Sequence, residues 1–193
     1  MVEGGGLESR RAERFRGFES HPRRSQGREP HGFTWRVDPA TGAVTATIGV
    51  GGYTISAVEG AVWVDNGIGD IARIDPTRNS VTALIKGPAF VARMAVGNGG
   101  VWVTEPQSGL GRDESGSLWR IDASRQTVAR TIPVGRSPRG VATGAGAVWV
   151  ANTLDGTISR IDPRTNKVVA TIKIGNTPRA LAVAYGLVWV TVD

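Results

Sequence analysis

The sequence predicts an all-β protein built from repeated four-stranded antiparallel blades, the arrangement of a β-propeller. A Gly-x-Val-Trp-Val segment occurs four times, with its tryptophans at positions 63, 102, 149 and 189. The intervals between them are 39, 47 and 40 residues, which is the length of one propeller blade. The composition agrees, because 40% of the residues are hydrophobic and 27 of 193 are glycine, as expected of a turn-rich β domain.

Residues 1–32 are predicted to form a disordered tail that precedes a propeller region at residues 33–193. The tail carries seven arginines, five glutamates and few β-branched residues, so it buries too little apolar surface to offset its chain entropy. An alternative is that the tail is not translated in nature, because Gly17-Phe18-Glu19-Ser20 is what the T-arm of a transfer-RNA gene encodes.

Each repeat of the propeller region divides into four segments of strand character. In the third full repeat they are Pro138 to Gly144, Ala147 to Asn152, Thr157 to Asp162 and Lys167 to Ile174. They are rich in Val, Ile and Thr and are bounded by Gly, Pro, Asn or Asp, which is typical of short strands joined by turns. We name them strands a to d, from the inner to the outer edge of a blade, and we expect no helix longer than one turn.

The turn between strands c and d has the clearest pattern, Asp-Pro-x-x-Asn or Asp-Pro-x-x-Gly. It occurs at residues 38–42, 75–79 and 162–166. Proline presets the backbone after the aspartate, and glycine or asparagine tolerates the left-handed exit. Residues 122–126, Asp-Ala-Ser-Arg-Gln, lack both the proline and the final glycine or asparagine, so we expect a looser turn there.

One tryptophan and one strand-c arginine recur in the repeats. We expect the tryptophans to fill the core between blades, and the alternative is that they stack on nucleic-acid bases. We expect the arginines to pack their aliphatic stems between blades and to pair their charged heads with neighbouring acids. These arginines are Arg36, Arg73, Arg120 and Arg160.

The order of the strands predicts the shape of the assembly. The chain opens with strands c and d at residues 33–50, continues through three full blades, and stops after strand b at Asp193. We expect an open arc of three full and two half blades, a fragment of a larger propeller. Such an arc exposes an apolar face at each end, including Trp189, which favours self-association. The alternative is a four-bladed ring closed by a composite blade made from the two halves.

The repeat resembles a known family. Residues 160–179, Arg-Ile-Asp-Pro-Arg-Thr-Asn-Lys-Val-Val-Ala-Thr-Ile-Lys-Ile-Gly-Asn-Thr-Pro-Arg, followed by Val-Trp-Val, resemble the YVTN or YncE-like β-propeller repeat. The resemblance covers residues 36–193. It implies the propeller fold but no particular activity, because such repeats occur in exported proteins, sensor regions and proteins of unknown role.

A more distant resemblance is to the streptogramin lyases, through Trp102-Val103-Thr104-Glu105. That family is understood to use a histidine base with acidic residues and magnesium. Here both histidines, His21 and His31, precede the propeller region, and the chain has no cysteine. The propeller region therefore lacks Ser/His/Asp and Cys/His catalytic arrangements, and we expect no metal site and no cofactor.

These observations favour a non-catalytic binding or scaffolding module over an enzyme. The alternatives are a lyase- or quinoprotein-type enzyme whose catalytic blades lie outside this chain, and a DNA-binding propeller. The net charge of +6 divides into +2 for residues 1–32 and +4 for residues 33–193, a spread that argues against nucleic acid as the partner. The sequence contains neither the apolar run of a signal peptide nor a membrane span, and it does not assign a compartment.

The candidate site lies where the strands d and a connect around the central channel. Counting back from the tryptophans places Tyr53, Ala92, Arg139 and Arg179 at one equivalent position, while Asn66, Glu105 and Asn152 begin the b-to-c loops. We expect these polar residues to form a locally basic rim that binds an acidic small molecule, an acidic peptide or a protein partner. The competing interpretation is that each arginine pairs with an acid such as Glu105 or Asp155, and that each asparagine caps its own turn.

Overall fold

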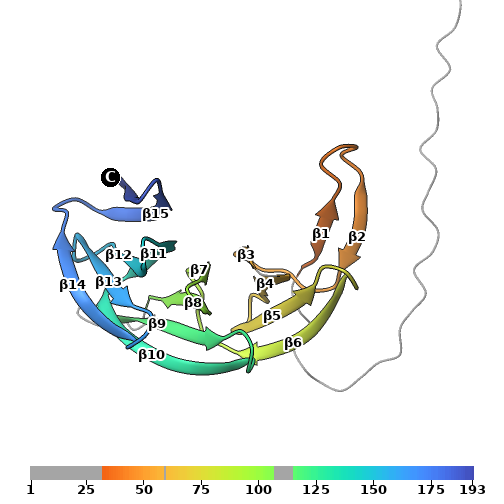
Figure 1. Cartoon of the computed structure of the whole chain (residues 1–193), viewed down its shortest axis with the longest axis horizontal. Helices are drawn as coiled ribbons and strands as arrows, with labels where there is room; N and C mark the ends of the chain where they lie inside the picture. The colour runs from red at the N-terminus through yellow and green to blue at the C-terminus, as the bar shows by residue number, and fades with distance from the viewer. Residues whose placement is uncertain (1–31, 59, 107–114) are drawn as a thin grey trace, which may run out of the picture.

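The computed structural model describes residues 32–58, 60–106 and 115–193. Within these residues there are sixteen strands and no helix, and hence no helix that could cross a membrane. The strands form five antiparallel sheets that follow one another along an open arc (Figure 1). Figure 1 shows the first strand of each full blade on the inner side of the arc and the last strand on the outer side.

The three full blades are four-stranded sheets in which neighbouring strands are consecutive in the chain. The first consists of β3 (Ile55–Val58), β4 (Ala61–Asp65), β5 (Asp70–Asp75) and β6 (Ser80–Lys86). The second consists of β7 (Arg93–Gly97), β8 (Gly100–Glu105), β9 (Ser115–Asp122) and β10 (Thr127–Arg136). The third consists of β11 (Pro138–Gly144), β12 (Ala147–Asn152), β13 (Thr157–Asp162) and β14 (Lys167–Lys173). The predicted strands of this third blade are confirmed, except that β14 ends one residue earlier than expected.

A two-stranded half blade stands at each end of the arc. The first pairs β1 (Thr34–Val37) with β2 (Val44–Ile48), and the last pairs β15 (Pro178–Ala184) with β16 (Leu187–Val192). The two half blades are separate sheets with no hydrogen bonds between them, and they lie apart in Figure 1. The prediction of an open arc is therefore confirmed, and a four-bladed ring closed by a composite blade is not formed.

The core consists of apolar clusters between neighbouring blades. Trp63 packs between the first and second full blades and Trp102 between the second and third, with exposed fractions of 1% and 0%. Trp149 is half-buried because only a half blade follows it. Trp189 is 55% exposed because the structure places no blade beyond it. The tryptophans are therefore interblade core wherever a full neighbour is present.

The turn at residues 122–126 is not looser than the others, so that prediction was wrong. Gln126 takes the left-handed conformation, with φ of 57°, and its N–H donates to the Asp122 carbonyl at 2.8 Å. Asn166 has φ of 56° and donates to the Asp162 carbonyl at the same distance. The aspartate and its backbone bonds therefore hold the turn, and glutamine bears a strain on the order of 1 kcal/mol.

The strand-c arginines connect blades through an interaction that the sequence did not reveal. Arg120 Nη1 donates at 2.8 Å to both the Pro163 carbonyl and Asn166 Oδ1 in the c–d turn of the next blade. Arg36 Nη1 donates to the equivalent atoms of Pro76 and Asn79, at 3.1 and 3.3 Å. We call this interaction the arginine link. The expectation that these heads pair with acids was wrong, because turn carbonyl and amide oxygens accept their hydrogen bonds.

Candidate functional site

Four of the seven positions predicted to form the rim meet at one cavity of about 440 Å³. It lies at the beginning of the inner strands β7, β11 and β15, next to the segment that leads into β3. All four equivalent positions line it: Tyr53, Ala92, Arg139 and Arg179. The sequence alignment from the tryptophans therefore placed side chains from four successive blades around a single hollow, which we call the rim cavity.

Two further side chains in the rim cavity were missed at the sequence level. Arg93 adds a third cation and Phe90 adds a second exposed aromatic ring. Both flank Ala92, the alanine that occupies the aligned position, so the alignment passed over them. The available signal was the cluster Phe90-Val91-Ala92-Arg93 itself, because an arginine one residue after the aligned position still begins strand β7.

The rim cavity is electrostatically positive. None of the described residues that line it is acidic, and the three arginines among them come from three different blades. Arg93 Nη1 donates to the Ala92 carbonyl at 2.9 Å, and Arg139 Nε donates to Ser137 Oγ at 3.3 Å. Arg179 alone of the three forms an ion pair within the described residues, with the exposed carboxylate of Asp193.

The acids named in the competing interpretation are engaged elsewhere. Glu105 Oε2 accepts a hydrogen bond from Trp119 Nε1 at 2.9 Å. Asp155 Oδ1 pairs with Arg136 Nε at 2.6 Å, and its second oxygen accepts from the Arg136 N–H at 2.8 Å. Neither carboxylate lines the rim cavity. The positive charge of Arg139 is therefore not neutralised by Glu105 or Asp155.

The pair of Asp155 and Arg136 fixes the loop after β12. Partial burial favours the neutral acid, but the side-chain and backbone hydrogen bonds from Arg136, together with its charge, hold the pKa of Asp155 below its ordinary value. Asp155 is thus a carboxylate under ordinary conditions. Its role is to join the end of β10 to the loop between β12 and β13.

Asn66 and Asn152 form hydrogen bonds within their own blades and do not line the rim cavity. Asn66 is buried, and its Oδ1 accepts from the N–H groups of Ile68 and Asp70 at 3.1 and 2.9 Å. Asn152 is also buried and donates from Nδ2 to Thr157 Oγ1 and Ser159 Oγ. Short amide side chains after a strand satisfy the nearby backbone and hydroxyl groups. The structure therefore separates these two residues and Glu105 from the three rim positions Tyr53, Arg139 and Arg179.

No group of three or more His, Cys, Asp or Glu residues that could hold a metal ion gathers within residues 32–58, 60–106 and 115–193. The rim cavity itself offers guanidinium groups, aromatic rings and small apolar side chains. Guanidinium groups recognise carboxylates and phosphates by charge-assisted hydrogen bonds. The arrangement is therefore suited to holding an anion.

The chain matches no protein-family model and no curated protein. Its fold is similar to the β-propellers of solved structures. Hydrazine synthase of Kuenenia stuttgartiensis is 18% identical with a TM-score of 0.62, covering 75% of this chain and 44% of that chain. BamB from Moraxella catarrhalis is 13% identical with a TM-score of 0.65, covering 83% and 50%. AztD from Citrobacter koseri is 20% identical with a TM-score of 0.54, covering 63% and 34%.

The chain thus spans half or less of the length of each of these three proteins. At 20% identity or below, the similarity establishes the fold and carries no information on activity. The three full blades and two half blades of this chain form a partial β-propeller.

Proposed function

We propose that this chain is a non-catalytic binding module that holds an anionic ligand in the rim cavity. One observation carries the proposal: Arg93, Arg139 and Arg179 reach the same cavity of about 440 Å³ from three blades, and no acid among the described residues lines it. Asp193 offsets the charge of Arg179. Arg93 and Arg139 form no ion pair within the described residues, and an anion between them relieves the repulsion of their like charges. A rigid β scaffold holds the three cations in place before the ligand arrives.

The aromatic rings define the ligand further. Tyr53 is 84% exposed and Phe90 is 54% exposed, and both line the rim cavity. A ligand that carries an apolar or planar group beside its carboxylate or phosphate gains contact with these rings. We therefore propose an acidic small molecule or a short acidic peptide as the ligand.

We propose further that the repeat is YncE-like and that the arc is part of a larger propeller. The blades of such a ring surround a central channel, and the rim cavity lies at the ends of the inner strands that face it. The lyase- or quinoprotein-type enzyme is a weaker candidate because the described residues that line the rim cavity include no paired nucleophile and base. A DNA-binding propeller would use the same arginines, and a steep dependence of binding on salt would reveal it.

The test compares anion binding by the parent protein and the double variant Arg139→Ala/Arg179→Ala. Citrate, inorganic phosphate and a hexaglutamate peptide are titrated by calorimetry, and thermal shifts are measured in parallel. We expect at least one of these probes to bind the parent and to lose tenfold or more in affinity in the variant. The matched control is Arg78→Ala/Arg164→Ala, which removes two arginines from the c–d turns and leaves the rim cavity intact. Equal binding by all three proteins, or no binding of any probe to the parent, would overturn the proposal.

A further inference from the structure

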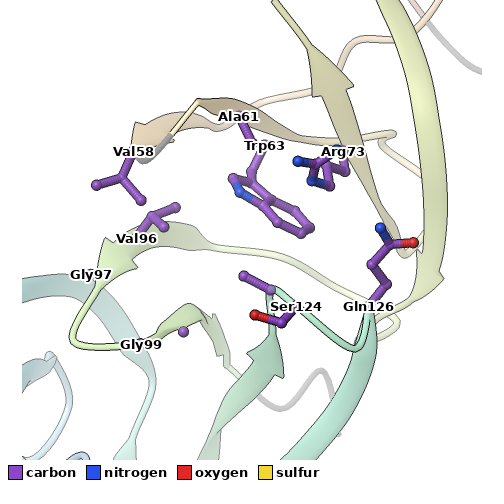
Figure 2. Close-up of a pocket in the computed structure, with 11 residues that line it drawn as sticks. Val58, Ala61, Trp63, Arg73, Val96, Gly97, Gly99, Ser124 and Gln126 are labelled. Carbon is purple, nitrogen blue, oxygen red and sulfur yellow. The ribbon is translucent and has the colours of Figure 1, made fainter.

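A second cavity, of about 320 Å³, lies between the first and second full blades (Figure 2). Trp63 and Arg73 line it from the first blade, and Val96, Ser124 and Gln126 line it from the second. In the view of Figure 2, Val58 and Val96 lie at one end, Arg73 and Gln126 lie at the other, and the indole of Trp63 is between them. We call this hollow the interblade cavity. It is separate from the rim cavity, since the two share no lining residue.

The interblade cavity lies where the arginine link is missing. At the junctions on either side, Arg36 and Arg120 donate to the turn of the next blade. Arg73 instead donates from Nη1 to Thr82 Oγ1 of its own blade, at 2.9 Å. No hydrogen bond among the described residues joins Arg73 to the turn at residues 122–126.

The sequence of that turn accounts for the difference. Its backbone forms the same closing hydrogen bond as the turn at residues 162–166. The Ala123 carbonyl, which corresponds to the acceptor carbonyls of Pro76 and Pro163, is therefore retained. The asparagine that accepts from Arg36 or Arg120 at the fourth position after the aspartate is replaced by Gln126, which is one methylene longer. The Gln126 amide lies on the wall of the interblade cavity, and the Arg73 guanidinium lies there too without bonding to it.

The tryptophan of this junction also differs from its equivalents. Trp102 and Trp149 donate from Nε1 to the carbonyls of Gly97 and Gly144, at 2.9 and 3.1 Å. Trp63 makes no such bond within the part of the chain that the structure describes. The guanidinium carbon of Arg120 lies 5.2 Å from the centre of the Trp102 ring, whereas Arg73 is not stacked on Trp63 in this way. The polar groups of Trp63 and Arg73 are thus less engaged than those of the next junction.

We propose that the interblade cavity is a binding site for a small carboxylate with a compact apolar body. The carboxylate takes the place of the missing turn oxygens and accepts from Arg73, with the Ser124 hydroxyl and the Gln126 amide as further donors. The apolar body lies against Trp63, Val58 and Val96. The volume is at the small end of the range of ligand pockets, about 300 to 1,000 Å³. The bound ligand would thus connect these two blades, as the arginine link does at the neighbouring junctions.

Benzoate is the probe, and benzamide is its uncharged counterpart of the same shape. Binding is followed by calorimetry and by amide chemical shifts in two-dimensional NMR. We expect benzoate to bind saturably, benzamide to bind at least tenfold more weakly, and Arg73→Gln to lose tenfold or more in benzoate affinity. Arg160→Gln is the matched control, because it removes the equivalent arginine from the third full blade, which contributes no residue to the interblade cavity.

A second variant keeps the proposal testable if Arg73→Gln folds poorly. Ala123→Pro/Gln126→Asn restores the Asp-Pro-x-x-Asn turn, so Arg73 is expected to form the arginine link. This variant should be more stable than the parent and should lose benzoate binding. Benzoate binding that persists in the restored variant, or that never saturates in the parent, would overturn the proposal. Loss of benzoate binding in Arg139→Ala/Arg179→Ala but not in Arg73→Gln would place benzoate in the rim cavity, which overturns this proposal and supports the proposed function.

Discussion

Trp149 and Arg160 lie opposite each other in the register of β12 and β13, with the guanidinium carbon 5.7 Å from the centre of the indole ring. The same cross-strand pairing joins Trp63 with Arg73 and Trp102 with Arg120. Each half blade carries only one member of the pair, Trp189 on β16 or Arg36 on β1. The free edge of β16 therefore complements the free edge of β1 of a second copy.

The first prediction is that the purified chain self-associates by joining these two edges. Trp189 should lie opposite Arg36 of the second copy, which places Val188 opposite Val37 in the register of the full blades. The chain has no cysteine, so Val188→Cys mixed with Val37→Cys should give a disulfide-linked heterodimer on oxidation. Light scattering should show a dimer or a larger closed assembly.

The control for this register is Val44→Cys, on the exposed part of β2 away from the free edge. It should form little disulfide with Val188→Cys. A monodisperse monomer at all concentrations, with no disulfide between Val37→Cys and Val188→Cys, would contradict the predicted association.

The second prediction concerns the arginine link between the second and third full blades. Arg120→Gln removes two hydrogen bonds at 2.8 Å and the stacking on Trp102, so it should lower the free energy of unfolding by about 2 to 4 kcal/mol. Arg73→Gln, which removes no link, should cost less than about 1 kcal/mol. Urea unfolding measures both, and equal losses would show that the link adds no stability.

The third prediction separates buried from exposed tryptophans of the same repeat position. Trp102→Ala should destabilise the chain by about 3 to 5 kcal/mol, because it leaves a void in a fully buried core. Trp189→Ala should change stability by about 1 kcal/mol or less when the chain is kept monomeric. Thermal and urea unfolding at low protein concentration would test the difference. Similar costs at the two positions would mean that the last half blade is covered in solution.

The fourth prediction is a loss of stability in acid. The pKa of Asp155 is held below its ordinary value of 3.8, and hydrogen bonds also lower the pKa values of Asp75, Asp122 and Asp162. The folded state thus holds these protons more weakly than the unfolded state, so their stabilisation is complete above pH 3.8 and is lost as the pH falls through the folded pKa values. The melting temperature should be level between pH 5 and 7 and fall below about pH 4.

Asp155→Asn provides the comparison for the acid prediction. It should be less stable than the parent at pH 7, and the difference should narrow toward pH 3 as Asp155 of the parent becomes protonated. A difference that stays constant over this range would show that the ion pair with Arg136 contributes no pH-dependent stability.

The strands could be predicted from the sequence because their signals are local. Alternation of Val, Ile and Thr between turn residues defined β11 to β13 to the residue. The tryptophan spacing also brought Tyr53, Arg139 and Arg179 to one cavity. The binding role of these residues and the division of the chain at residue 33 stay predictions, and residues 1–31 of the predicted tail lie outside the described residues.

What could not be predicted depends on contacts between repeats. Arg120 and Asn166 are 46 residues apart in the chain, and each alone has a sufficient local explanation, as a strand residue and as a turn residue. The alignment placed Asn66 and Asn152 at the start of the b-to-c loops and so predicted that they belong to the rim. In the structure both side chains are buried within their own blades. The family resemblance that the repeat carries is likewise not established by the solved structures, which share only the fold.

The missing link between Arg73 and the turn at residues 122–126 also has a consequence for cooperativity. Blades in such an array interact only with their neighbours, so the array behaves like a one-dimensional chain of coupled units. The absent connection lowers the coupling between the first and second full blades, so hydrogen exchange should show β1 to β6 opening as a unit distinct from β7 to β16. A single altered turn would thus divide this arc into two cooperative units that are joined by one weakened interblade junction.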